Sequence, residues 1–140
     1  MTAIGYLDVF LRLGAAVLAG AIIGFDREIR DKPAGLRTLT LVSLGSAVFT
    51  LTALGTPDSI SRVIQGIVTG VGFLGAGTII RGRDEHSVRG LTTAASVWLA
   101  AAIGVACALA DWPIVLAASV FGMFVLTLEG IEARIKARMK

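Results

Sequence analysis

One stretch decides how this chain is interpreted, 66-GIVTGVGFLGAGTII-80. It has five glycines in its first twelve positions, carries no charge and is otherwise mostly apolar. Residues 70–75 also match the dinucleotide-binding fingerprint GxGxxG, which has meaning only between a strand and a helix of an α/β unit. Here the glycines lie within an apolar segment, bounded by arginines, that is long enough to span a bilayer. We therefore interpret them as sites of close contact between membrane helices.

The composition of the chain points to an integral membrane protein. Of its 140 residues, 55% are hydrophobic and 16% are charged, whereas soluble domains have about a quarter charged residues. A soluble core of this size could not hide so much apolar surface. The length predicts a single domain over residues 1–140. The one cysteine, Cys107, lies in an apolar run, so the sequence predicts neither a disulfide framework nor a CxxC metal site.

Five apolar stretches have the length of a transmembrane helix. Hydrocarbon about 30 Å thick needs about 20 apolar residues in a helix. The five stretches are residues 9–25, 36–54, 63–80, 91–110 and 112–128. The only prolines, Pro33, Pro57 and Pro113, lie at the breaks, where a missing N–H costs little. We predict an all-α polytopic membrane protein with five transmembrane helices.

The distribution of lysine and arginine predicts the orientation of these helices. The first and third loops and the C-terminal tail hold eleven of the 13 lysines and arginines, and Arg62 is the only loop cation on the opposite side. Cytoplasmic loops carry the excess of such residues, so we expect the N-terminus outside and the C-terminus inside. This topology also accounts for the net charge of +3. We therefore expect the lipid bilayer as partner and no nucleic acid.

Apart from Arg37 at the very start of the second span, Arg12 is the only basic residue within a predicted span. Asp8 lies one helical turn earlier, at the spacing that lets opposite charges meet. The pair could lie at the outer interface with Arg12 extending outward to water. The alternative places it at the outer mouth of a solute pathway.

A weak internal repeat relates the two halves of the chain at an offset of 55 residues. The sequences 35-GLRT-38 and 90-GLTT-93 open the second and fourth spans, and Gly20-Ala21 aligns with Gly75-Ala76. Such a repeat would place an axis along the membrane normal, as in some transporters.

Motifs of catalysis are missing from the sequence. It has no nucleophile elbow, no HExxH and no Walker loop, so we do not expect an enzyme. Polar chemistry is concentrated at the predicted inner face instead, in a constellation of charged and hydroxyl residues. Its members are Arg27, Arg37, Thr38, Asp84, Arg89, Thr92 and Thr93. The threonines lie where hydroxyls cap helix N-termini, which requires no ligand.

Two acids beside this constellation are candidate metal ligands. Asp26 and Glu28 follow the first apolar stretch, and hydrated Mg²⁺ typically binds one or two carboxylates. The alternative is that these acids pair with neighbouring arginines and fix the loops.

Glycines spaced by four residues predict close helix contacts. Gly20 with Gly24, and Gly66 with Gly70, form small-xxx-small faces. With Gly72, Gly75 and Gly77, they make the third span the expected central packing element. The same faces could join two subunits, so we expect a homodimer or larger oligomer.

Four segments together resemble the MgtC/SapB family of bacterial membrane proteins. They are 19-AGAIIGFDRE-28, 32-KPAGLRT-38, 70-GVGFLGAG-77 and 88-VRGLTTAA-95. The resemblance implies an inner-membrane protein linked to Mg²⁺ homeostasis or stress adaptation, which modulates other membrane machinery. A small ion or solute transporter or channel, with a pathway between the half-repeats, is the alternative.

This sequence departs from part of the family pattern. Thr92 and Leu99 stand where members associated with growth in low Mg²⁺ tend to have Asn and Cys. Those members also continue into a soluble C-terminal domain, whereas this chain ends at Lys140. The resemblance therefore implies a member with the membrane domain only.

Overall fold

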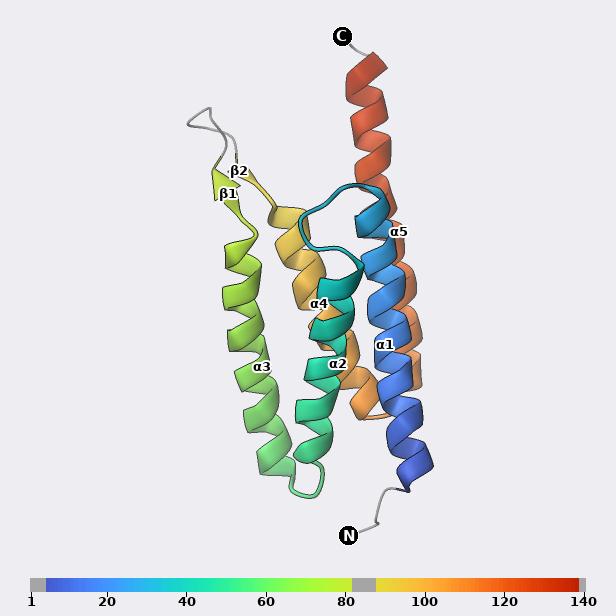
Figure 1. The fold of residues 1–140 in the computed structure, drawn as a ribbon, viewed down its shortest axis with the longest axis vertical. Helices are drawn as coiled ribbons and strands as arrows, with labels where there is room; N and C mark the ends of the chain where they lie inside the picture. Colours follow the sequence, from blue (N-terminus) through green and yellow to red (C-terminus); the bar gives the residue numbers. More distant parts are fainter. Residues whose placement is uncertain (1–4, 82–87, 139–140) are drawn as a thin grey trace.

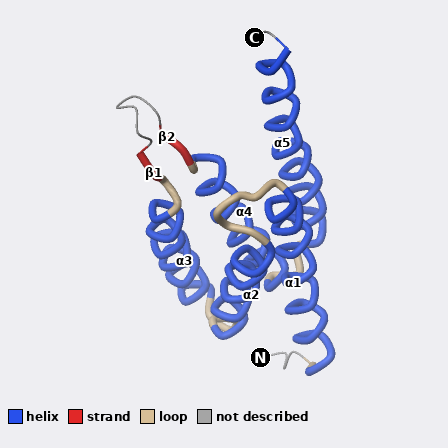
Figure 2. The backbone as a smooth tube through the Cα atoms, turned by 45° about the horizontal axis from the view of Figure 1, so that its top comes forward, coloured by secondary structure: helices blue, strands red, loops and turns tan. Residues whose placement is uncertain are grey.

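The computed structural model describes residues 5–81 and 88–138 (Figure 1). Within them the chain forms five helices and a two-stranded antiparallel ribbon. The elements are α1 (Tyr6–Ile29), α2 (Leu36–Thr52), α3 (Pro57–Gly77), β1 (Ile80–Arg81), β2 (Val88–Arg89), α4 (Leu91–Ala108) and α5 (Trp112–Arg138). The helices lie alongside one another in a bundle, as the tube in Figure 2 shows. The prediction of an all-α fold is confirmed, and each predicted span corresponds to one helix.

Three of these helices are long and apolar enough to cross a membrane. They are α1, residues 58–77 of α3, and α4. The other two are apolar but shorter: α2 has 17 residues, and the apolar part of α5 covers Trp112–Leu128. Seventeen helical residues reach roughly 25 Å, slightly less than the hydrocarbon thickness of about 30 Å.

The helix boundaries differ from the sequence expectation most at α3 and α5. Helix α3 begins at Pro57 rather than at residue 63, because the fixed φ of proline suits the first helical position. It ends at Gly77 because Ile80 pairs with Arg89 in the ribbon, which the sequence analysis did not predict. Helix α5 continues ten residues past its predicted end and projects beyond the rest of the bundle (Figure 1).

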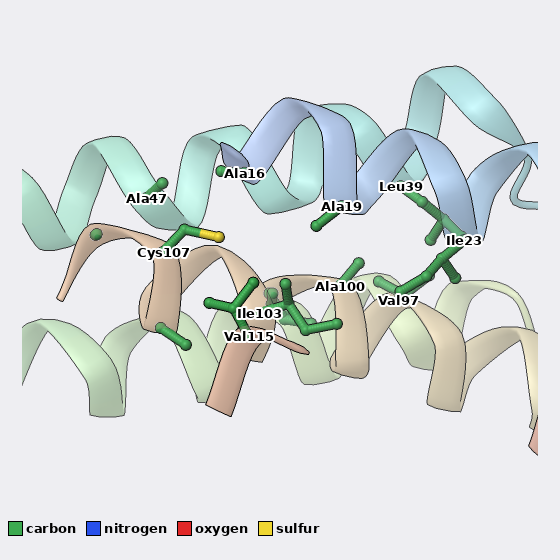
Figure 3. Close-up of a cluster of buried hydrophobic side chains, with 14 of the residues drawn as sticks. Ala16, Ala19, Ile23, Leu39, Ala47, Val97, Ala100, Ile103, Cys107 and Val115 are labelled. Atoms are coloured by element: carbon green, nitrogen blue, oxygen red, sulfur yellow. The ribbon is translucent and has the colours of Figure 1, made fainter. Parts of the chain in front are cut away.

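Helix α4 lies at the centre of the bundle and contacts all four other helices. Its small side chains allow this, because alanine and serine can be approached from several sides. Ala100 and Cys107 are fully buried, and in Figure 3 they lie with Ala16 and Ala19 of α1 in one cluster. Gly104 of α4 has no room for a side chain, since a Cβ there would collide with the backbone of Ser43 in α2.

The glycines of α1 and α3 have different surroundings. A Cβ on Gly20 would lie 2.8 Å from the carbonyl oxygen of Leu39, and one on Gly24 would lie 2.7 Å from Cα of Leu36. Both glycines therefore let α1 lie against the backbone of α2.

Helix α3 lies at the edge of the bundle (Figures 1 and 2), which corrects the expectation that it is the central packing element. Only Gly75 of its glycines meets another helix, at ordinary contact distance from Ala94 of α4. A Cβ would meet nothing within 4 Å at the other four, Gly66, Gly70, Gly72 and Gly77. The physical reason is that glycines permit close contact but do not specify which helix makes it. Helix α4 has small residues on several faces, so the other helices can pack closely against it.

One helix contact recurs at the offset of the predicted internal repeat. Gly20 lies against Leu39, and Gly75 lies against Ala94. Each residue of the second pair lies 55 positions after the corresponding residue of the first pair. Helices α2 and α4 also begin 55 residues apart, each after a glycine N-cap. The halves α1–α2 and α3–α4 are thus similar in arrangement. The halves differ in how tightly the first helix of each packs against the second helix of the other, since α1 contacts α4 more extensively than α3 contacts α2.

Candidate functional site where α1 meets α4

The site is built around Arg27 in the last turn of α1. It is the largest fully buried side chain among the described residues, with 0% of its surface exposed. Its Nη2 donates a hydrogen bond of 2.8 Å to Oγ1 of Thr93, which is 2% exposed. A buried charge is tolerated only when it is hydrogen-bonded or paired. This contact therefore ties the end of α1 to the first turn of α4.

The turn before α4 sets the direction of Thr93. Gly90 has φ +93°, a left-handed conformation that glycine adopts without strain. A Cβ at this position would collide with the backbone carbonyl of Thr78. The ribbon can therefore lead directly into α4, with Thr93 facing α1 and Thr92 exposed. Thr92 contributes its carbonyl oxygen, which accepts a 2.8 Å hydrogen bond from the Ser96 hydroxyl.

The loop between α1 and α2 is closed by Glu28. Its Oε2 accepts a 2.9 Å hydrogen bond from the backbone N–H of Leu36, the first residue of α2. The N-cap residue Gly35 has no side chain with which to satisfy such a donor. At the end of α1, Asp31 adopts a left-handed φ of +52°, and the N–H of Lys32 bonds to the carbonyl of Arg27. Glu28 thus has the capping role that the sequence analysis considered for the threonines.

Asp26 is held by a different partner. Arg30, one turn later, donates from Nε to both carboxylate oxygens of Asp26 at 3.0 Å. Since Glu28 accepts a hydrogen bond from the start of α2, both predicted Mg²⁺ ligands have hydrogen-bond partners within the protein. Within residues 5–81 and 88–138, no three His, Cys, Asp or Glu residues are grouped to hold a metal ion. A hydrated Mg²⁺ needs only one or two carboxylates, so its binding by Asp26 and Glu28 stays a prediction.

An open polar cavity of about 570 Å³ is lined in part by Glu28, which follows Arg27 in α1. Its lining residues come from the α1–α2 loop and the start of α2: Glu28, Asp31, Lys32, Pro33, Gly35, Arg37 and Thr38. Both Arg37 and Thr38 are exposed. The cavity carries charges of both signs, so it suits a polar or zwitterionic group better than a simple anion.

The predicted constellation is therefore divided by the fold. Arg27 and Thr93 meet in the interior, and Arg37 and Thr38 line the open cavity. Arg89 is exposed on β2. Asp84 lies outside the described residues.

A second arginine fastens the same two helices at their other ends. Arg12 pairs with Asp8 at 2.7 Å, as the sequence predicts. Its Nη1 also donates a 2.6 Å hydrogen bond to the carbonyl of Ala108, the last residue of α4, and its side chain is 16% exposed. A cation is favourable at a helix C-terminus. Arg12 and Arg27 are 15 positions apart on α1, and Thr93 and Ala108 are 15 apart on α4, as antiparallel helices require.

Sequence reasoning placed Arg27 in the site but missed its burial. A helical-face signal was present, since Ala16, Gly20, Ile23 and Arg27 follow one another at spacings of three and four residues. All four are buried. The arginine continues the face that packs on the neighbouring helices.

The MgtC family model matches residues 13–133 of the chain. Protein MgtC of Salmonella typhimurium (strain LT2) is 50% identical over 111 residues, which are 79% of this chain and 47% of that protein. Protein MgtC of Brucella abortus (strain 2308) is 50% identical over 97 residues, which are 68% of this chain and 40% of that protein. Protein SrpB of Synechococcus elongatus is 38% identical over 141 residues, covering 91% of this chain and 76% of that protein. No solved structure matches the chain.

The chain spans about half the length of the MgtC proteins that it matches. The family match includes Arg27, Thr93 and the helices that bring them together. On the basis of this match and these identities, the chain belongs to the MgtC family of membrane proteins.

Proposed function

We propose that this chain is a non-enzymatic, multi-pass inner-membrane protein that serves Mg²⁺ homeostasis or stress adaptation by modulating another membrane protein. One observation carries the proposal: the most deeply buried charged group, Arg27, holds two helices together. Glu28, the next residue of α1, lines the open cavity. A ligand or partner bound in this cavity would act on the packing of α1 against α4.

The link to Mg²⁺ rests on the family, and in this proposal the link is indirect. Asp26 and Glu28 are bound to Arg30 and to the start of α2. A response to Mg²⁺ would then come through the partner or through the membrane surface. In this proposal the excess of cations places the cavity at the cytoplasmic face.

The transport alternative needs a pathway between the half-repeats. At that boundary α2 and α4 are in backbone contact, because Gly104 has no space for a Cβ next to Ser43. Ala47 and Cys107 on these helices are 0% exposed. This dense packing favours the modulator over the transporter.

Growth of a bacterium that lacks its own MgtC-family protein tests the proposal. We expect the full chain to restore growth when Mg²⁺ is limiting and Arg27→Met to fail at an equal level in the membrane. Thr92→Val is the matched control, because this residue lies in the same helical turn as Thr93 but is exposed. Failure of the parent chain to restore growth would contradict the role. Ion flux in reconstituted vesicles would instead establish the transporter.

A further inference from the structure

Helix α3 turns its polar and small residues away from the bundle. Val71 and Gly75 are buried, and Ile64 and Ile67 are partly buried, on the side that faces the other helices. At 100° per residue, the opposite side carries a different set of residues, all of them exposed. We call it the α3 outer face: Asp58, Arg62, Gln65, Gly66, Thr69, Gly72, Phe73 and Ala76.

This composition is unlike that of the other exposed faces of the bundle. Helix α1 exposes Phe10 and Leu18, and α5 exposes Leu116 and Phe121, all by more than half of their surface. Large apolar side chains are what lipid tails accommodate. On the α3 outer face, Phe73 is the one large hydrophobic residue.

Three polar side chains of this face have no partner within the described part of the chain. Asp58, Arg62 and Gln65 make no side-chain hydrogen bond or ion pair there. Thr69 does, since its hydroxyl donates to the carbonyl of Gln65 at 2.9 Å. An amide without a hydrogen-bond partner is costly beside hydrocarbon. The face therefore has donors and acceptors that lipid tails cannot satisfy.

We propose that the α3 outer face binds the same face of a second copy of this chain, with the two α3 helices parallel about a two-fold axis along the membrane normal. In such an interface each residue pair occurs twice with the roles exchanged. The face is suited to this because its groups are complementary to themselves. A carboxamide both donates and accepts, so Gln65 can pair with its own copy.

The charges at the start of α3 favour the same occupant. Asp58 and Arg62 lie one turn apart on this face, and their opposite signs let each pair with the other residue in the second copy. A partner of unrelated sequence would need to supply both charges in the same order. A second copy does so by symmetry.

The backbone is open where the two helices would approach. A Cβ on Gly66 or Gly72, the two glycines of this face, would meet nothing within 4 Å in the chain, and glycines let membrane helices lie close together. Gly66 also borders an apolar groove of about 640 Å³ between α2 and α3. Phe73, which is 82% exposed, lies next to the groove residue Leu74 along α3. In a parallel pair, the second copy's Phe73 would lie at the depth of this groove.

Cysteine cross-linking of the full chain in membranes tests the contact. The background is Cys107→Ala, which removes the one native thiol. We expect Thr69→Cys to form a disulfide-linked dimer under mild oxidation. Val120→Cys is the control, because Val120 is exposed on another helix, eight residues after the start of α5, as Thr69 is exposed twelve residues after the start of α3. It should stay monomeric.

Fluorescence energy transfer between labelled copies of the chain in vesicles measures the association constant of the dimer. Gln65→Leu should lower the association constant about three- to twentyfold, the range for hydrogen bonds between membrane helices. Arg62→Asp should also weaken association, and adding Asp58→Arg should restore it, which a misfolded variant could not show. The proposal is overturned if Thr69→Cys cross-links no more than Val120→Cys, or only to another protein. Failure of the double charge exchange to restore association would also overturn it.

Discussion

The hydrogen bond between Arg27 and Thr93 can be measured with a double-mutant cycle. Thr93→Val keeps the shape of the side chain and removes the hydroxyl, and Arg27→Met keeps an unbranched apolar stem and removes the charge. The difference between the double variant and the sum of the single variants reports this contact alone. Other interactions of Arg27 cancel, because they are the same with either residue at position 93.

The expected coupling is about 1.5 kcal/mol. Hydrogen bonds to charged groups contribute about 1.5–3 kcal/mol in proteins, and the 2.8 Å distance with exposures of 0% and 2% leaves no competing water. Membrane proteins show smaller values, on average about 0.6 and at most about 1.7 kcal/mol, because the unfolded chain in the membrane also finds partners. The charge and the burial place this pair near the upper end of that range.

Unfolding titrations in mixed micelles provide the assay, with the fluorescence of Trp98 and Trp112 as signal. Each single variant should lose at least the coupling energy, and Thr92→Val should change stability by no more than about 0.5 kcal/mol, as exposed substitutions do. A coupling below about 0.3 kcal/mol would show that Arg27 is not held by Thr93, and the interpretation of the site would fail.

Three further predictions use the same unfolding assay. Gly104→Ala should lower the free energy of unfolding by about 1–3 kcal/mol, because the new Cβ collides with the α2 backbone. Gly70→Ala should instead stabilise the single chain by up to about 1 kcal/mol. Equal effects of the two substitutions would refute the packing described. Arg12→Met should destabilise the protein by about 1–3 kcal/mol, because it removes the hydrogen bond to the last carbonyl of α4. Asp8→Asn should cost less than about 1 kcal/mol, because the ion pair is partly exposed. A larger loss of stability from Asp8→Asn than from Arg12→Met would contradict this. Glu28→Ala should lower the stability by about 1 kcal/mol, because it removes a helix cap. Glu28→Gln should cost much less, because the amide keeps an oxygen that can accept the hydrogen bond. A similar loss from both substitutions would show that the charge of Glu28 matters instead.

Much of the fold follows from signals local in the sequence. Apolar length defines the five helices, and prolines at the breaks define where they separate. The pairing of Asp8 with Arg12 follows from one-turn spacing, and the contacts of Gly20 and Gly24 follow from small residues spaced by four. Each of these signals lies within one helix or one loop.

The arrangement of the helices was less predictable, because it depends on which faces meet. Glycine content favoured α3 as the centre, yet α4 lies there, since its alanines and Gly104 are distributed over several faces. The protein partners of the two acids next to Arg27 were also not predictable, because a sequence shows that carboxylates are near each other but not which groups bind them. Only the fold shows that Glu28 reaches eight residues along the chain to Leu36.

The internal repeat explains why α3 is free to bind a second copy. Helix α1 is fastened across the repeat to α4 by Arg12 at one end and Arg27 at the other. The positions 55 residues later are Ile67 and Gly82, and neither residue carries a charge or a hydrogen-bonding side chain. Helix α3 therefore has no equivalent arginines with which to close on α2, and a groove remains between them. Because the second half has no counterparts of these two charged side chains, α3 is bound to its neighbours mainly through α4, and its polar face is available to another subunit.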